Sequence, residues 1–80
     1  MKYRKKPLDV DAILFDGSNH NECKAFIEGN YDNTLKYPNV KTLNGVVRVE
    51  APEWIIRGVR GEYYPCKPDI FAETYEEVAL

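Results

Sequence analysis

Histidine and cysteine are scarce in this chain of 80 residues, which holds one histidine and two cysteines. His20 stands in the polar stretch Ser-Asn-His-Asn, and a lone histidine on a loop lacks the partners that a metal site or a catalytic triad requires. Cys23 and Cys66 lie far apart and outside any Cys-x-x-Cys arrangement. Neither a zinc site nor a disulfide is therefore indicated, and both cysteines are expected to be reduced thiols.

The motifs of cofactor binding and acid–base catalysis are also missing. The sequence has no phosphate-binding loop and no glycine fingerprint for a dinucleotide. Its paired carboxylates, Asp9 with Asp11 and Glu76 with Glu77, are alternate or adjacent residues, and such pairs usually form a solvated face. We therefore expect a protein that is not an enzyme and that uses neither a cofactor nor a metal.

Long apolar runs are absent as well. No stretch approaches the roughly 18 apolar residues of a membrane span. Asp9 and Asp11 interrupt the segment that follows the basic start of the chain, so a signal peptide is not expected either. The protein is expected to stay in the compartment in which it is made, without a membrane partner.

Positive charge is confined to one end of the chain. The formal net charge is −2, and four of the eleven Lys and Arg residues are Lys2, Arg4, Lys5 and Lys6. The remainder has seven cations against thirteen acids, a balance of −6. Because domains that bind nucleic acid usually have a basic balance, nucleic acid is not the expected partner. The basic start is expected instead to keep an edge strand soluble.

The residues that are present predict one α+β domain over residues 1–80. Apolar and polar residues alternate from Leu8 toward Phe15, which predicts a strand. A short helix is predicted over 22–28, closed by Gly29, with one apolar face that packs on the sheet (Cys23, Phe26 and Ile27). The expected fold is an antiparallel β-meander or small sheet, with this one helix packed on it and a C-terminal helical turn.

Two hairpins are predicted in the second half of the chain, and together they give a meander of four consecutive strands. Asn44-Gly45 is the signature of a two-residue type I′ turn, which would place Leu43 opposite Val46 and Val40 opposite Val49. The second hairpin reverses over 58–61, where two glycines permit positive φ values and leave an arginine at the tip.

The C-terminal segment has two interpretations. Asp69 is expected to cap a helical turn over 70–73. Residues 74–78 then form a short last strand, or the helix continues to Glu77.

The second hairpin also carries the most prominent group of candidate binding residues, in which aromatic rings alternate with cations. The candidates are Arg57, Arg60, Tyr63, Tyr64 and Lys67, with Trp54 nearby. On adjacent strands such residues can stack a base or hold a phosphate. In the alternative interpretation, Trp54 and one tyrosine fill the core and the arginine stems lie over the edge. A further alternative places the recognition site on the turn-rich loop that carries Tyr31 and Tyr37.

Both ends of the chain resemble the small uncharacterised proteins encoded by tailed bacteriophages and prophages. The resemblance rests on Tyr-Arg-Lys-Lys-Pro at 3–7, on Thr-Leu-Asn-Gly at 42–45 and on Trp-Ile-Ile-Arg-Gly-Val-Arg-Gly-Glu-Tyr-Tyr-Pro-Cys-Lys-Pro-Asp-Ile-Phe at 54–71. The chain departs from it at 51–54, with Ala-Pro-Glu-Trp in place of Pro-Gly-Asp-Trp. The resemblance implies a viral origin and action in the host cytoplasm.

These observations lead to two functional hypotheses. The first is a phage or prophage accessory protein that acts as a non-enzymatic binding module on a host protein or a small metabolite, with counter-defence as one role open to it. The alternative is a nucleotide or nucleic-acid binding protein that uses the hairpin over 54–67. Exposed rings beside a basic face would favour the alternative, whereas an exposed apolar sheet face would favour a protein partner or a homo-oligomer.

Overall fold

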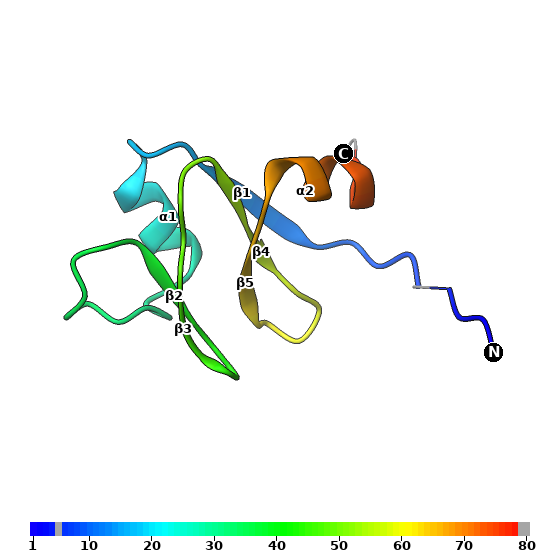
Figure 1. Ribbon diagram of the computed structural model, residues 1–80, viewed down its shortest axis with the longest axis horizontal. Coiled ribbons are helices and arrows are strands. Elements are labelled where there is room, and N and C mark those ends of the chain that lie inside the picture. The colour runs from blue at the N-terminus through cyan, green and yellow to red at the C-terminus, as the bar shows by residue number, and fades with distance from the viewer. Residues whose placement is uncertain (5, 79–80) are drawn as a thin grey trace.

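The computed structural model describes residues 1–4 and 6–78, so Lys5 of the basic start lies outside the described residues. Within the described residues, five strands and two helices follow one another (Figure 1). They are β1 (Asp11–Phe15), α1 (His20–Phe26), β2 (Asn39–Thr42), β3 (Gly45–Arg48), β4 (Glu53–Arg57), β5 (Tyr63–Cys66) and α2 (Pro68–Thr74). All strand pairs are antiparallel. The predicted α+β class is confirmed.

The strands form two sheets rather than one continuous meander. One sheet has the order β1-β4-β5 and the other consists of β2 and β3. The predicted pairing of β3 with β4 is wrong, because β4 pairs with β1, with Ile13 opposite Ile55. The physical reason lies in β4, where the adjacent residues Ile55 and Ile56 point to opposite faces and are both buried. Such a strand needs a central position, with a neighbour on each side and cover on both faces.

The β2–β3 hairpin exists, but its predicted register is wrong. Val40 lies opposite Val47, and Thr42 lies opposite Gly45. Gly45 has a φ of 111°, whereas Asn44 is not among the described residues with positive φ. The turn therefore consists of Leu43 and Asn44, followed by a glycine in a left-handed conformation, and it is not type I′.

One face of the three-stranded sheet carries the main core. Phe15 and Ile55 from this sheet, Cys23 and Ile27 from the α1 region and Val40 from β2 are all buried together. The prediction that Cys23, Phe26 and Ile27 form the packing face of the helix is confirmed. The helix begins at His20, two residues earlier than predicted, and the chain reverses after it through Gly29, with a φ of 81°.

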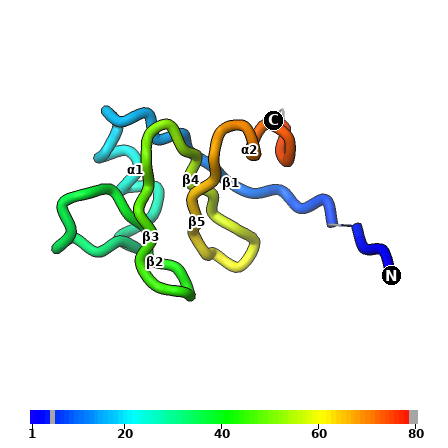
Figure 2. The backbone as a smooth tube through the Cα atoms, in the orientation of Figure 1, coloured from blue at the N-terminus to red at the C-terminus, as the bar shows by residue number. Residues whose placement is uncertain are grey.

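The opposite face of the same sheet is covered by α2 at the C-terminal end of the chain (Figure 2). Ile56 is fully buried there, and Trp54 stacks on Phe71 of α2. Asp69 is not the helix cap: Lys67 is the N-cap residue and Pro68 opens the first turn. The helix ends at Thr74, and residues 75–78 form neither the predicted strand nor more helix.

The N-terminal segment differs from its prediction too. Strand β1 begins at Asp11 and not at Leu8, whose side chain is exposed. Residues 1–4 and 6–10 have no regular secondary structure, and the chain before β1 runs outward from the body (Figure 1). β1 is an edge strand, but the described basic residues at 2, 4 and 6 precede it and do not lie on it.

Candidate binding site

The five candidate residues of the second hairpin do not form one surface. Arg57 lies on β4, where its Nη2 donates to Asp11 Oδ2 at 2.6 Å and its Nη1 is 3.7 Å from Glu28 Oε1. Its charge is therefore balanced by two carboxylates within the domain. The bond to Asp11 is also the main reason that the pKa of Arg57 is raised.

Tyr63 and Tyr64 are separated by the sheet. Tyr63 is only 4% exposed and packs edge-on against Phe26, with ring centroids 5.8 Å apart. Tyr64 points to the α2 face, where its hydroxyl is 3.2 Å from the hydroxyl of Tyr75. Burial, followed by this hydrogen bond, raises the pKa of Tyr64. Tyr63 is a core residue, so its ring cannot be presented to a ligand.

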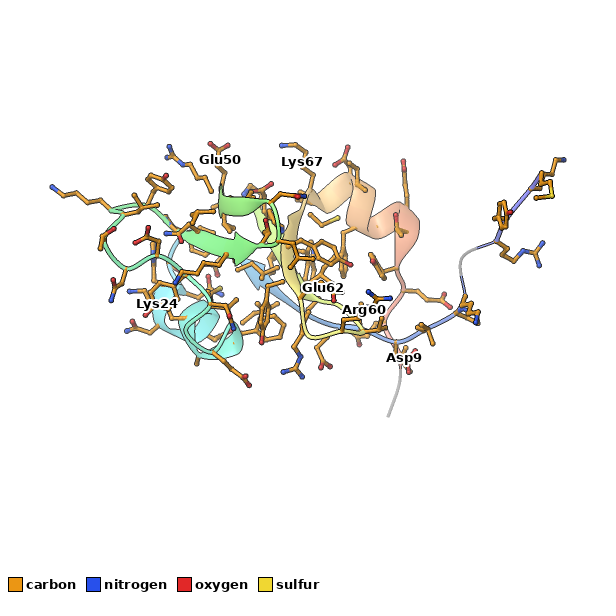
Figure 3. All side chains as sticks on the ribbon, turned by 90° about the horizontal axis from the view of Figure 1, so that it is seen from below. Asp9, Lys24, Glu50, Arg60, Glu62 and Lys67 are labelled. Carbon is orange, nitrogen blue, oxygen red and sulfur yellow. The ribbon has the colours of Figure 1, made fainter. Side chains whose placement is uncertain are left out.

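Arg60 and Lys67 are exposed, but they lie apart, one at the hairpin tip and the other ahead of α2 (Figure 3). The Arg60 backbone N–H donates to Glu62 Oε2 at 3.1 Å. The Glu62 carboxylate occupies the space that a Cβ at position 58 would need. That carboxylate is the end of a flexible side chain, so it could move aside for a larger residue at position 58. Only Gly61 of the two glycines has the predicted positive φ, 79°.

Trp54 belongs to an aromatic stack and not to the predicted cation surface. Its ring lies 4.2 Å from that of Phe71 at an interplanar angle of 10°, and Phe71 lies 5.1 Å from Tyr75. One face of the indole is thus covered by protein. The nucleotide alternative needs a free ring beside a cation, and the hairpin does not bring those two features together.

A cavity lies elsewhere, between α1 and the loop that leads to β2. We call it the α1 pocket. Its volume is about 120 Å³. The floor is apolar and shared with the main core (Phe15, Cys23, Ile27, Val49 and Ile55), and the walls come from α1 and from the loop over 31–39 (His20, Lys24, Tyr31, Asp32, Asn33, Leu35, Lys36, Tyr37, Pro38 and Asn39).

The loop that forms the wall is held by its own polar groups. Asn39 is buried and its Oδ1 accepts from the Asp32 N–H at 2.7 Å, while its Nδ2 donates to the carbonyls of Asp32 and Tyr37 at 3.1 and 2.9 Å. Asp32 Oδ1 in turn accepts from the N–H and hydroxyl of Thr34. These bonds from Thr34 hold the pKa of Asp32 below its usual value. The wall is therefore formed without a ligand, as is common for binding pockets.

The rim of the α1 pocket has cationic character. Lys24 and Lys36 line it, and Lys24 Nζ lies 5.5 Å from the ring centre of Tyr31. Asp32 is the acidic residue among the described lining residues, and its Oδ1 is occupied within the loop. A cationic rim above an apolar floor suits a ligand with an apolar body and an anionic end.

The sequence pointed to part of this site. Tyr31 and Tyr37 were predicted as an alternative recognition loop, and both line the pocket. Lys24, Lys36 and Asn39 were not singled out. The position of Asn39 after Pro38 at the end of a turn-rich loop was the available signal, since Asn side chains commonly bind neighbouring backbone groups there.

Two further observations describe the molecule as a whole. No three His, Cys, Asp or Glu side chains within residues 1–4 and 6–78 are placed to hold a metal ion. In that same part of the chain, no helix has the length and apolar character that crossing a bilayer requires.

Comparison with known proteins gives no match. No family model, no curated protein and no solved structure is significantly similar to the chain.

Proposed function

We propose that this protein is a phage or prophage accessory protein that acts as a non-enzymatic binding module in the host cytoplasm and takes a small metabolite in the α1 pocket. The resemblance of its two ends to small phage proteins supports the setting. The choice of the α1 pocket as the site, and of an anionic ligand, rests on the cationic rim of Lys24 and Lys36 above an apolar floor.

The dimensions of the pocket define the ligand class. Its volume is about 120 Å³, and an apolar cavity of roughly 150 Å³ holds a single benzene ring. The apolar part of the ligand is therefore no larger than about one ring. A carboxylate or phosphate at its other end would lie between Lys24 and Lys36, where a charge-assisted bond fixes the orientation.

The chemistry of the pocket favours binding over catalysis. Burial raises the pKa of the Cys23 thiol, with Glu22 and Asp16 acting in the same direction. A thiol held in its protonated form is a poor nucleophile. The ring of His20 packs edge-on against Phe15, with centroids 5.1 Å apart. Both groups therefore serve as wall and floor in this proposal.

A host protein is the second class of partner. A single side chain projecting from such a protein could enter the same pocket, with Tyr31 and Tyr37 at the rim as the contact surface. Blocking a host defence factor would be one use of that contact.

The test is capture from host lysate with the tagged protein, followed by mass spectrometry of the released small molecules and proteins. We expect the wild-type protein to retain a small anionic compound. The double variant Lys24→Gln/Lys36→Gln and the single variant Tyr31→Ala should both fail to retain it. Lys41→Gln is the matched control, because Lys41 is exposed and lies outside the pocket.

Arg60→Ala separates the alternatives in the same experiment. A ligand that is lost from Arg60→Ala and kept by the α1 pocket variants would assign recognition to the second hairpin and overturn the proposal. Recovery of nucleic acid with that pattern would favour the nucleotide alternative.

A further inference from the structure

A second and larger depression runs alongside α2, on the sheet face opposite the α1 pocket. We call it the α2 groove. Its volume is about 600 Å³, and it is lined by residues 7–12, Trp54, Phe71 and residues 74–78. None of these residues lines the α1 pocket, so the two sites are separate.

The floor of the α2 groove is aromatic. Trp54, Phe71 and Tyr75 stack in a row, with centroid distances of 4.2 and 5.1 Å. Its apolar walls include Leu8 and Val78, each 58% exposed. A row of stacked rings presents π surface and edges at which aromatic and cationic side chains bind favourably.

The charge of the groove has one sign. The carboxylates of Asp9, Asp11, Glu76 and Glu77 line it, and no Lys, Arg or His is among its described lining residues. Asp11 is paired with Arg57 across β1 and β4. Asp9, Glu76 and Glu77 remain as acids on the two segments that flank the aromatic floor.

The same chain carries a segment of complementary chemistry, which we call the basic arm (residues 1–6). It contains the cations Lys2, Arg4 and Lys6 in the described part, and Lys5 in the sequence. Tyr3 stands between two of these cations and is 87% exposed. The arm thus offers one aromatic ring and several cations to a groove with an aromatic floor and several acids.

We propose that the basic arm of one copy lies in the α2 groove of a second copy, and that the exchange is reciprocal, giving a two-fold symmetric dimer. Tyr3 packs against the edges of Trp54 and Phe71, because the faces of Phe71 are covered by Trp54 and Tyr75. Lys2, Arg4 and Lys6 face the carboxylates of the groove. Both features come from one chain, so no other partner is needed to satisfy them.

The geometry of the junction favours a second copy over the arm's own groove. Residues 7–12 form one wall of the groove, and the arm begins immediately before that wall. The Leu8 N–H donates to the Lys6 carbonyl at 2.9 Å, which orders the junction. From there the chain runs outward, and its N-terminus lies far from the body (Figures 1 and 2). An arm entering from a symmetry mate needs no reversal at Pro7.

A charge exchange between two variants of the full-length protein tests the proposal. One variant reverses the arm (Lys2→Glu, Arg4→Glu and Lys6→Glu) and the other reverses the groove (Asp9→Lys, Glu76→Lys and Glu77→Lys). Sedimentation velocity at low ionic strength should show a dimer for wild type, monomers for each variant alone and a heterodimer for their equimolar mixture. Added salt should weaken each dimer, because the ion pairs are exposed.

Two controls exclude unfolding and a nonspecific effect of net charge as explanations. Thermal melting by circular dichroism establishes that each variant is folded. A variant with Glu22→Lys, Glu50→Lys and Glu73→Lys makes the same charge change at exposed positions outside the groove, and it should still form the dimer. Tyr3→Ala changes a side chain that is 87% exposed and lies outside the helices and strands, and it should raise the dimer dissociation constant by about tenfold.

Three outcomes would overturn the proposal. They are a wild type that stays monomeric across the concentration range, a dimer that persists in either charge variant alone, and a mixture of the two variants that fails to associate. A monomeric wild type that binds an added Lys- and Arg-rich peptide would assign the groove to another protein instead of a second copy.

Discussion

At the scale of single residues, the adjacent tyrosines on β5 show how the sheet divides neighbouring side chains. Tyr63 packs in the main core under α1, and Tyr64 lies beneath α2 on the other face. The sequence predicted both as candidate binding residues, with one of them in the core as the alternative. It could not assign them to a face, because that assignment depends on the pairing of β1 with β4, which are separated by residues 16–52.

Tyr63→Ala is expected to lower the free energy of unfolding by about 3 kcal/mol or more, because it removes a buried ring from the main core. Tyr63→Phe keeps the ring and should cost less than about 1 kcal/mol. Arg60→Ala, at the exposed tip of the same hairpin, should change stability by less than about 0.5 kcal/mol. Urea denaturation of the three variants measures these differences. Equal stabilities for Tyr63→Ala and Arg60→Ala would remove Tyr63 from the core.

The titration of Tyr64 should lower the free energy of unfolding at alkaline pH. Its pKa is raised in the folded state from an ordinary value of 10.0, first by burial and then by the hydrogen bond with Tyr75. Above about pH 10 the unfolded chain loses this proton while the folded chain keeps it, so the free energy of unfolding falls as pH rises. Below that pH the contribution is complete.

Tyr64→Phe removes the titrating group, so the decline in stability above about pH 10 should become shallower. Tyr37→Phe removes an exposed phenol as the matched control. Denaturation midpoints measured from neutral to alkaline pH for wild type and both variants test this prediction. A decline that is identical in wild type and Tyr64→Phe contradicts the assignment.

At the scale of elements, the parts that were predicted correctly rest on short-range patterns. The apolar face of α1 and the existence of both hairpins are encoded within a few residues of each other. The predictions that were wrong, such as the turn type and register of the β2–β3 hairpin, depend on packing between segments far apart in the sequence. Asn44-Gly45 predicted a type I′ turn, but Val40 is buried at 0% exposure beside Ile55 and Tyr63. Packing of this hairpin against the other sheet fixes its register, and Gly45 then becomes the first residue of β3.

Gly45→Val is expected to destabilise the protein by about 1 kcal/mol or more, because the φ of 111° at Gly45 is strained for a residue with a Cβ. No neighbouring atom blocks a Cβ there, so the cost comes from the backbone alone. Leu43→Ala is the control in the same turn, where the side chain is 98% exposed. Thermal melting of both variants measures the cost, and a Gly45→Val protein as stable as Leu43→Ala would contradict the left-handed conformation.

At the scale of the whole molecule, the candidate sites show what a sequence of this kind can and cannot predict. The second hairpin was chosen for its aromatic and cationic residues, yet folding buries Tyr63, pairs Arg57 with Asp11 and stacks Trp54 on Phe71. The α1 pocket and the α2 groove each combine segments far apart along the chain. Their residues carry no shared local motif, so only the arrangement of the two helices on opposite sheet faces brings them together.

The two sheets share the main core. Val40 and Val49 from the hairpin region share the main core with Phe15, Ile27 and Ile55. Val40→Ala should therefore lower the free energy of unfolding of the whole domain by about 2 kcal/mol, and not only fray the hairpin. Val46→Ala is the matched control, because Val46 is on the same hairpin but 43% exposed, and it should cost less than about 0.5 kcal/mol.

Two probes on opposite sides of the molecule test whether unfolding is cooperative. Fluorescence of Trp54 reports on the α2 face, and backbone circular dichroism reports on all strands and helices. The two transitions should coincide in wild type and shift together in Val40→Ala, as a single cooperative unit requires. If Val40→Ala shifts only the circular dichroism transition and leaves that of Trp54 in place, the hairpin melts independently, and the three-stranded sheet with α2 is stable without it.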